Sequence, residues 1–164
     1  MGDLFYAVYR KAGIHFEYSV NEKVALEVAF ASASLGLRSM VFMKHVGMNV
    51  ASDAMLSIAY TGTRGGLVIM TADDPSMHSS QNEQDNRHYA DLGHLPMIEP
   101  TTPQEAKDFI PLAFDISERY RTPVIFRTTT MISHERGLVQ VKHTEKPREI
   151  VPFESGKAEF NSLP

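Results

Sequence analysis

The chain has no cysteine among its 164 residues. It therefore forms no disulfide and holds no iron–sulfur cluster through thiolates, so any electron-transfer centre must lie elsewhere. No window reaches 18 uninterrupted apolar residues, and the N-terminal stretch "MGDLFYAVYRKAG" lacks the basic-then-apolar profile of a signal peptide. These absences predict a cytoplasmic protein.

Neither sign of charge dominates the composition. The chain carries 16 basic and 20 acidic side chains, which gives a formal net charge of −4. This balance favours solubility and does not indicate nucleic acid or an anionic membrane as a partner. The length predicts one globular domain with a substantial core.

Several short motifs of enzyme and metal sites are also missing. The glycine-rich stretch Thr61–Gly66 has neither the dinucleotide-binding pattern nor the P-loop pattern, and Gly62 is better interpreted as a helix C-cap. No Gly-x-Ser-x-Gly elbow is present, so a hydrolase is not indicated. Asp73 and Asp74 lie near His78, but without a metal-binding spacing we interpret them as a solvated turn and assign no metal to the chain.

Short apolar runs alternate with longer helical patterns, which predicts an α/β fold with a mainly parallel sheet covered by helices on both faces. Residues 1–140 are expected to form this domain, and residues 141–164, rich in proline and charge, a C-terminal tail or arm. The predicted strands are Ile14–Tyr18, Ser39–Met43, Leu67–Ala72, Met97–Ile98 and Val124–Arg127. The predicted helices are Asp3–Lys11, Glu22–Leu35, Asn49–Tyr60, Glu83–Leu92 and Gln104–Tyr120, the last with Thr102 as its cap.

Polar stretches follow three of the predicted strands: Ser19–Glu22, Lys44–Asn49 and His78–Arg87. In a parallel sheet such loops gather at the carboxyl ends of the strands, where ligands bind. Two of them also fit simple capping boxes, Ser19 with Glu22 and Ser80 with Glu83. The capping and ligand-binding interpretations both remain open from the pattern alone, although a cap does not need ten polar residues.

Four blocks in this order carry a resemblance to a known family: "SVNEKVALEVA", "KHVGMNVASD", "AYTGTRGGLVIMTADDPSMHSSQNEQDNR" and "TPVIFRTTTMISHERG". The chain resembles the thiamine-diphosphate-dependent 2-oxoacid:ferredoxin oxidoreductases, and among them the α subunits of the indolepyruvate enzymes, from about Phe5 to Gly137. The resemblance implies the pyrimidine-binding domain of the thiamine-diphosphate-binding fold, a three-layer sandwich with a parallel sheet between helices.

The resemblance also implies roles for individual residues. Glu22 would lie against the aminopyrimidine ring of the cofactor, and a carboxyl group shielded from water there would stay protonated, donate a hydrogen bond to the ring and so activate the cofactor. The cofactor side would comprise Glu22, His45, Gly47 and Asn49, and the substrate side His78, Ser79, Ser80, Gln81 and Asn82. Amide and hydroxyl groups suit a substrate carboxylate and a developing oxyanion.

Other parts of the enzyme would have to come from elsewhere. The sequence has no Gly-Asp-Gly motif, so the diphosphate and its magnesium ion are expected on another domain or chain. The first strand of the family's domain has no counterpart here, and the almost wholly apolar helix Glu22–Leu35 predicts cover from a second domain or subunit in a homo- or hetero-oligomer. Iron–sulfur clusters and coenzyme A would belong only to the complete enzyme, with ferredoxin as an indirect partner.

The expected function is therefore that of a fragment or subunit of an oxidoreductase that converts a 2-oxoacid, such as the aryl compound indolepyruvate, to an acyl-CoA. Two alternatives remain: a small subunit of a non-oxidative 2-oxoacid decarboxylase, and a non-catalytic remnant that binds a partner.

Overall fold

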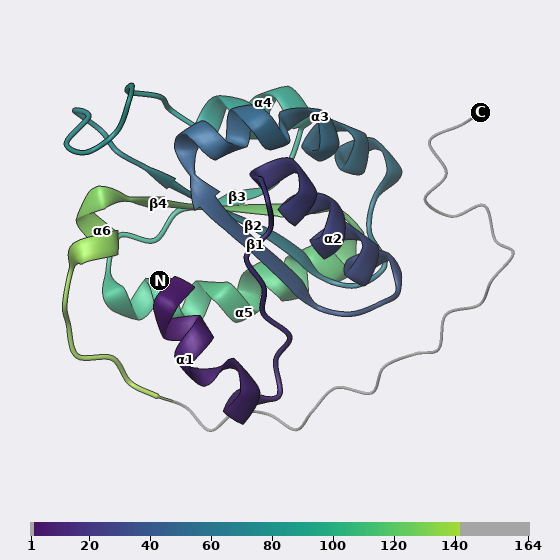
Figure 1. Ribbon diagram of the computed structural model, residues 1–164, viewed down its shortest axis with the longest axis horizontal. Helices are drawn as coiled ribbons and strands as arrows, with labels where there is room; N and C mark the ends of the chain where they lie inside the picture. Colours follow the sequence, from purple (N-terminus) through teal and green to yellow (C-terminus); the bar gives the residue numbers. More distant parts are fainter. Residues whose placement is uncertain (1, 142–164) are drawn as a thin grey trace, which may run out of the picture.

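The computed structural model describes residues 2–141, and the predicted tail falls almost entirely in residues 142–164, outside the described part. The described chain forms three layers, a parallel sheet with helices on each of its two faces (Figure 1). The strands are β1 (Ser39–Lys44), β2 (Leu67–Asp73), β3 (Met97–Ile98) and β4 (Val124–Thr129), in the spatial order β1-β2-β4-β3. The helices are α1 (Gly2–Ala12), α2 (Glu22–Ser34), α3 (His45–Thr61), α4 (Arg87–Gly93), α5 (Pro103–Tyr120) and α6 (Thr130–His134).

The continuous apolar runs form the strands because both faces of the sheet are covered. Along β2, Leu67 and Ile69 point into a core shared with α2, α3 and α4. Val68 and Met70 point into a second core on the opposite face, against α5. Successive side chains of a strand alternate between faces, so a strand buried on both sides needs apolar residues at every position. The predicted fold class and all four of these strands are confirmed.

Two helix ends form as the sequence predicts. The Oγ1 atom of Thr102 accepts a hydrogen bond from the Glu105 amide at 3.2 Å, at the start of α5. The Glu105 carboxylate reaches the amide and hydroxyl of Thr101, each at 2.7 Å, rather than the cap residue itself. Gly62 ends α3 with φ 77°, and a Cβ there would lie 2.7 Å from the carbonyl oxygen of Arg121. Position 62 therefore requires glycine for two reasons, its positive φ angle and the lack of space for a side chain.

The predicted strand Ile14–Tyr18 is wrong. This segment is an irregular connection between α1 and α2 and pairs with none of the strands within residues 2–141. Its apolar character is used in ring contacts instead: Phe16 stacks on Phe5 at 6.1 Å and on Phe42 of β1 at 6.1 Å. α1 buries no residue and joins the sheet through the same rings, with Phe5 and Phe42 5.8 Å apart.

Two helix starts differ from the prediction by four residues, and one helix was not predicted. α3 begins at His45, so most of the predicted Lys44–Asn49 loop is the first turn of a helix. α4 begins at Arg87 and not at Glu83, so the predicted cap at Ser80 is absent. The short helix α6, which follows β4 directly, was not predicted.

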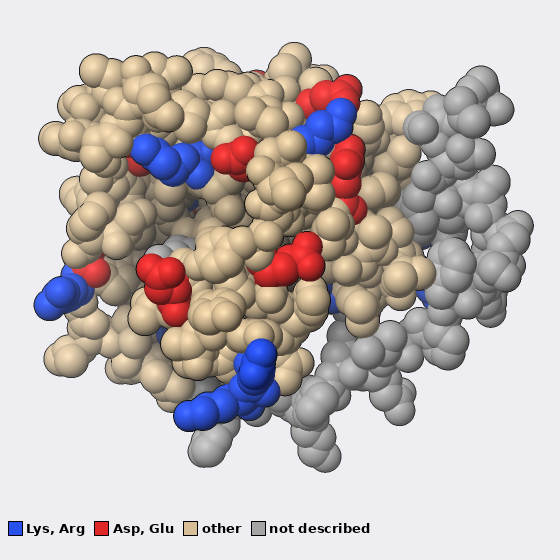
Figure 2. Space-filling view, in the orientation of Figure 1, with Lys and Arg blue, Asp and Glu red and all other residues tan. Residues whose placement is uncertain are grey.

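On the face shown in Figure 2, the described residues form no extended area of one charge, and their acidic and basic side chains are interspersed. Among residues 2–141, no helix combines the length and apolar character needed to cross a membrane.

Candidate functional site

Glu22 is the first residue of α2, but it does not serve as the partner in a capping box. The cap is Asn21, whose side-chain oxygen accepts a hydrogen bond from the Val24 amide at 2.9 Å. The predicted cap at Ser19 is therefore wrong, because an Asn immediately before the helix already binds the free amide. The Glu22 carboxyl forms no hydrogen bond or ion pair with any of residues 2–141, so it is available to a ligand.

Gly47, in the first turn of α3, gives the Glu22 side chain its space. A Cβ atom on Gly47 would lie 2.6 Å from the Cγ of Glu22 and 2.9 Å from its Oε1. Contacts this short do not occur in stable proteins, so any side chain at position 47 would displace Glu22. The fold thus brings together two of the residues predicted on the cofactor side.

His45 is the first residue of α3 and is fully buried. Its Nε2 lies 3.0 Å from the carbonyl oxygen of Asn82 and 3.1 Å from the Asn82 side-chain oxygen. Both of these atoms are acceptors, so Nε2 carries the proton and Nδ1 is left as an acceptor in the neutral ring. The Nδ1 atom is buried and has no hydrogen-bond partner among the described residues.

The second half of the polar stretch holds α3 in place. The side-chain amide of Gln84 donates to the His45 carbonyl at 2.9 Å, and its oxygen accepts from the Asn49 side chain at 3.0 Å. The hydroxyl of Tyr89 donates to the Asn49 oxygen at 2.6 Å. Asn49 therefore points to the loop before α4, and its role in the structure is to connect that loop to α3.

A buried ion pair lies beneath this loop. Asp73 and Arg127 are 1% and 3% exposed, and the Nε of Arg127 donates to Oδ2 of Asp73 at 2.7 Å. The same oxygen accepts the amide of Asn86 at 2.9 Å, while Nη1 of Arg127 lies 2.6 Å from Glu99. Asn86 in turn donates through its side chain to the Thr71 hydroxyl at 2.5 Å. The carboxyl ends of β2 and β4 are thus joined to the loop by charged and amide groups.

The first half of the stretch is anchored by Asp74. Its carboxylate accepts the Ser79 amide at 2.8 Å and the Thr130 hydroxyl at 2.7 Å. These hydrogen bonds, that from the Ser79 amide foremost, hold the pKa of Asp74 well below its usual value, so this carboxyl is charged. The interpretation of Asp73 and Asp74 as a solvated turn is wrong, since both are buried and bound by protein donors.

The residues predicted on the substrate side lie on the loop between β2 and α4, which projects from one edge of the sheet (Figure 1). His78, Ser79, Gln81 and Asn82 are exposed, and Ser80 is half-buried. Ser79 and Asn82 are tied to Asp74 and His45, whereas the side chains of His78 and Gln81 form no hydrogen bond with residues 2–141.

The residues that hold this site together are Asp73, Gln84, Asn86 and Arg127. The sequence pattern gave no separate role to the last three and placed Asp73 in a solvated turn. A signal was present: Asp73 and Arg127 are each the single charged residue of a largely buried strand. A charge in such a run must be paired to be tolerated, so two such charges on neighbouring strands indicate a buried pair.

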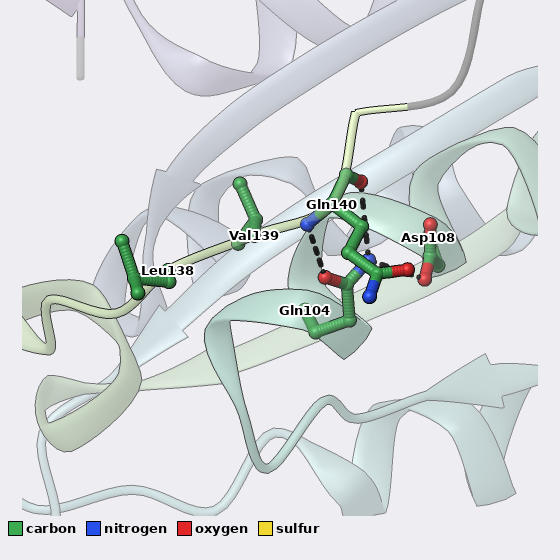
Figure 3. Close-up of a pocket in the computed structure, with 5 residues that line it drawn as sticks. All are labelled: Gln104, Asp108, Leu138, Val139 and Gln140. Carbon is green, nitrogen blue, oxygen red and sulfur yellow. Dashed lines mark hydrogen bonds between the residues drawn. The ribbon is translucent and has the colours of Figure 1, made fainter.

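A separate hollow of about 570 Å³ lies beside the N-terminal half of α5 (Figure 3). Its lining residues are Gln104, Asp108, Leu138, Val139 and Gln140. The Gln104 side chain donates to Asp108 at 2.7 Å and accepts the Gln140 amide at 2.7 Å, so its polar groups serve to hold residues 138–140 against α5. None of these residues belongs to the site at Glu22.

The chain matches the family described as pyruvate flavodoxin/ferredoxin oxidoreductase, thiamine diphosphate-binding, over residues 2–163. It is 59% identical to indolepyruvate oxidoreductase subunit IorA of Methanothermobacter marburgensis over 140 residues, which are 85% of this chain and 23% of that protein. It is 53% identical to the protein of the same name from Thermococcus kodakarensis over 161 residues, 98% of this chain and 24% of the relative. The chain thus spans about a quarter of these relatives.

A solved structure with a similar fold is 2-oxoglutarate:ferredoxin oxidoreductase from Magnetococcus marinus, with a TM-score of 0.60 and 20% sequence identity. The similarity covers 79% of this chain and 24% of that chain. At this identity the comparison concerns the fold, and it agrees with the parallel three-layer arrangement.

Proposed function

We infer the function from one premise: the chain belongs to the pyruvate flavodoxin/ferredoxin oxidoreductase family, as a thiamine-diphosphate-binding domain. We propose that it is the pyrimidine-binding domain of an enzyme that oxidatively decarboxylates a 2-oxoacid and passes the electrons to ferredoxin. The names of its relatives support indolepyruvate as the substrate. Because the chain spans a quarter of those relatives, the diphosphate and magnesium site, the iron–sulfur clusters and the coenzyme A site are proposed on other parts of the assembly.

The described residues fit an aminopyrimidine ring. The Glu22 carboxyl has no partner within residues 2–141, and it extends over a glycine where any Cβ would block it. The buried Nδ1 of His45, in the same turn of α3 as Gly47, also lacks a partner there. A ring with both donor and acceptor atoms can satisfy a protonated carboxyl and an imidazole acceptor.

Thiamine diphosphate, when bound, supplies a nucleophilic carbon and an electron sink for loss of carbon dioxide from a 2-oxoacid. The chain's own contribution is to hold a proton on the Glu22 carboxyl and donate it in a hydrogen bond to the pyrimidine. Gly47 keeps that position open, and His45 fixes the first turn of α3 relative to Asn82. The amide and hydroxyl groups of Ser79 to Asn82 are proposed to face the reacting 2-oxoacid.

The observation that carries the proposal is the placement of Glu22 over Gly47, with its carboxyl free of any capping role. A capping-box glutamate would fold back on its own helix. Here Asn21 performs the capping, which leaves Glu22 directed to the neighbouring helix.

The test is Glu22→Gln in the assembled enzyme. Loss of the acidic proton should slow hydrogen–deuterium exchange at the thiazolium carbon of the cofactor by about 10²- to 10⁴-fold, the usual range for general acid–base groups. The free energy of unfolding should change little, because Glu22 forms no hydrogen bond or ion pair within residues 2–141. Exchange is measured by NMR after acid quenching.

Glu27→Gln is the matched control, since Glu27 is an exposed carboxyl on the same helix. In this variant the hydrogen on the thiazolium carbon should exchange at the parental rate. Exchange at the parental rate in Glu22→Gln as well would remove Glu22 from the mechanism.

The reaction product separates the oxidative reaction from a non-oxidative decarboxylase. The oxidative reaction forms indoleacetyl-CoA and reduced ferredoxin, whereas the non-oxidative one forms the free aldehyde. The cytoplasmic location and the division at residues 140 and 141 stay predictions.

A further inference from the structure

The proposed substrate is an anion, and most basic groups around the site are already neutralised. A 2-oxoacid carboxylate placed at the carboxyl edge of the sheet would meet the charged carboxylate of Asp74 and the buried Asp73. A positive charge that is not already paired with a carboxylate would therefore favour binding. The paired basic groups are Lys23 with Asp53 at 2.7 Å, Arg87 with Asp85 at 2.8 Å, and Arg127 with Asp73 at 2.7 Å and Glu99 at 2.6 Å.

Lys44 differs from these residues. It is the last residue of β1, it is exposed, and its ammonium forms no ion pair with a carboxylate in residues 2–141. Its hydrogen bond goes to the carbonyl oxygen of Ser79, at 3.2 Å. A carbonyl is neutral and takes one of the three N–H donors of an ammonium, so two donors and the full charge remain for a ligand.

The backbone of Ser79 also fixes where the ammonium lies. The amide of Ser79 donates to Asp74 at 2.8 Å, and its carbonyl accepts from Lys44. The two consecutive peptide groups that meet at Ser79 are thus each hydrogen-bonded, which positions the ammonium against the loop between β2 and α4. This loop carries the groups proposed to face the 2-oxoacid.

Lys44 is also close to the proposed position of the cofactor. Gly47, against which the Glu22 carboxyl lies, follows Lys44 by three residues. Lys44 is the residue immediately before α3, so its backbone lies within about one helical turn, roughly 5 Å, of Gly47. A carboxylate bound at Lys44 would therefore lie near the space that Glu22 borders, on the side of the Ser79 loop.

We propose that Lys44 binds the carboxylate of the 2-oxoacid substrate, with the Ser79 carbonyl as the group that positions its ammonium. This inference rests on the proposed function, because it assumes that a 2-oxoacid enters this site. It adds a substrate-binding residue that lies on the sheet and carries a positive charge, beside the amide and hydroxyl groups of the neighbouring loop.

The test is Lys44→Gln in the assembled enzyme with indolepyruvate. Loss of one charge-assisted contact should raise KM by roughly 10- to 100-fold, with a smaller change in kcat. Inhibition by indole-3-acetate should weaken by the same factor, while inhibition by indole-3-acetamide, which has the same shape without the charge, should stay at the parental value. Lys44→Arg keeps the charge and should recover much of the affinity.

Lys107→Gln is the charge-matched control, since Lys107 on α5 already pairs with Asp108 at 2.6 Å. An unchanged KM in Lys44→Gln would overturn the role of Lys44 and leave the proposed function standing. An equal loss of inhibition by indole-3-acetate and by indole-3-acetamide would have the same meaning. If the parental assembly bound thiamine diphosphate but turned over no 2-oxoacid, the proposed function itself would fall, and the role of Lys44 with it. The affinity of the Lys44→Gln assembly for thiamine diphosphate should equal that of the parental assembly.

Discussion

At the scale of single residues, the pair of Asp73 and Arg127 decides how the loop over the site is held. Its two charges are almost completely removed from water, and each has a further partner, the Asn86 amide for Asp73 and Glu99 for Arg127. Taking charges out of water is costly, and this cost is offset only while both partners are present. The pair therefore contributes a fixed geometry more than net stability.

Arg127→Met should lower the free energy of unfolding by about 3–5 kcal/mol, because it leaves Asp73 buried without its counter-ion. Urea denaturation at neutral pH, followed by circular dichroism, measures this change. The comparison is Arg38→Met, which removes an exposed guanidinium paired with Asp115 and Glu118 and should cost no more than about 1 kcal/mol. Equal losses in the two variants would show that burial of the first pair has no energetic consequence.

The residue scale is also where the sequence pattern predicts least. The S-x-x-E pattern indicated Ser19 as the cap, whereas the structure uses Asn21, and only the family resemblance drew attention to Glu22. The contact of Glu22 with Gly47 joins residues that are 25 positions apart, so no local pattern encodes it. Asp73 and Arg127 could have been recognised as charges within apolar strands, but their partners depend on the strand order.

At the scale of elements, the strands were predictable because their character is local. β1, β2, β3 and β4 are bounded apolar runs, and the helices that cover both faces of the sheet require that composition. The starts of α3 and α4 were not predictable from the sequence, because they depend on groups that are distant along the chain. His45 can enter a helix, buried and with its Nε2 satisfied, because Asn82 supplies an acceptor from another loop.

The start of α5 provides an element-scale prediction. Thr102→Ala removes the oxygen that accepts the Glu105 amide and should destabilise the domain by about 1 kcal/mol. Thr102→Ser keeps that oxygen and should retain nearly the parental stability. Thermal or urea unfolding of both variants measures the difference, and an Ala variant as stable as the Ser variant would mean that the cap makes no contribution here.

At the scale of the whole molecule, the charged groups of the site predict how stability depends on pH. The hydrogen bond from the Arg87 side chain is the main cause that lowers the pKa of Asp85 to about 2, and the Ser79 amide chiefly lowers that of Asp74. An unfolded aspartate has a pKa of about 3.9, so between these values the unfolded chain binds more protons than the folded one. The stabilisation is complete above about pH 4 and is lost as the pH falls toward 2.

Urea midpoints measured from pH 7 down to pH 2 should therefore fall steeply over the lowest two units. Asp85→Asn removes one of the groups responsible and should flatten the profile in that range. A profile with the same slope in Asp85→Asn would show that this carboxylate is not stabilised by the fold.

The attachment of α1 has one more consequence. The helix buries none of its residues and touches the sheet through aromatic rings, with Leu4, Tyr6 and Val8 facing solvent. Its local opening therefore costs little free energy compared with unfolding of the cores, because few apolar contacts are given up. The N-terminal helix can separate from the sheet and rebind while both cores stay intact, so its backbone amides and the core amides report on two different equilibria.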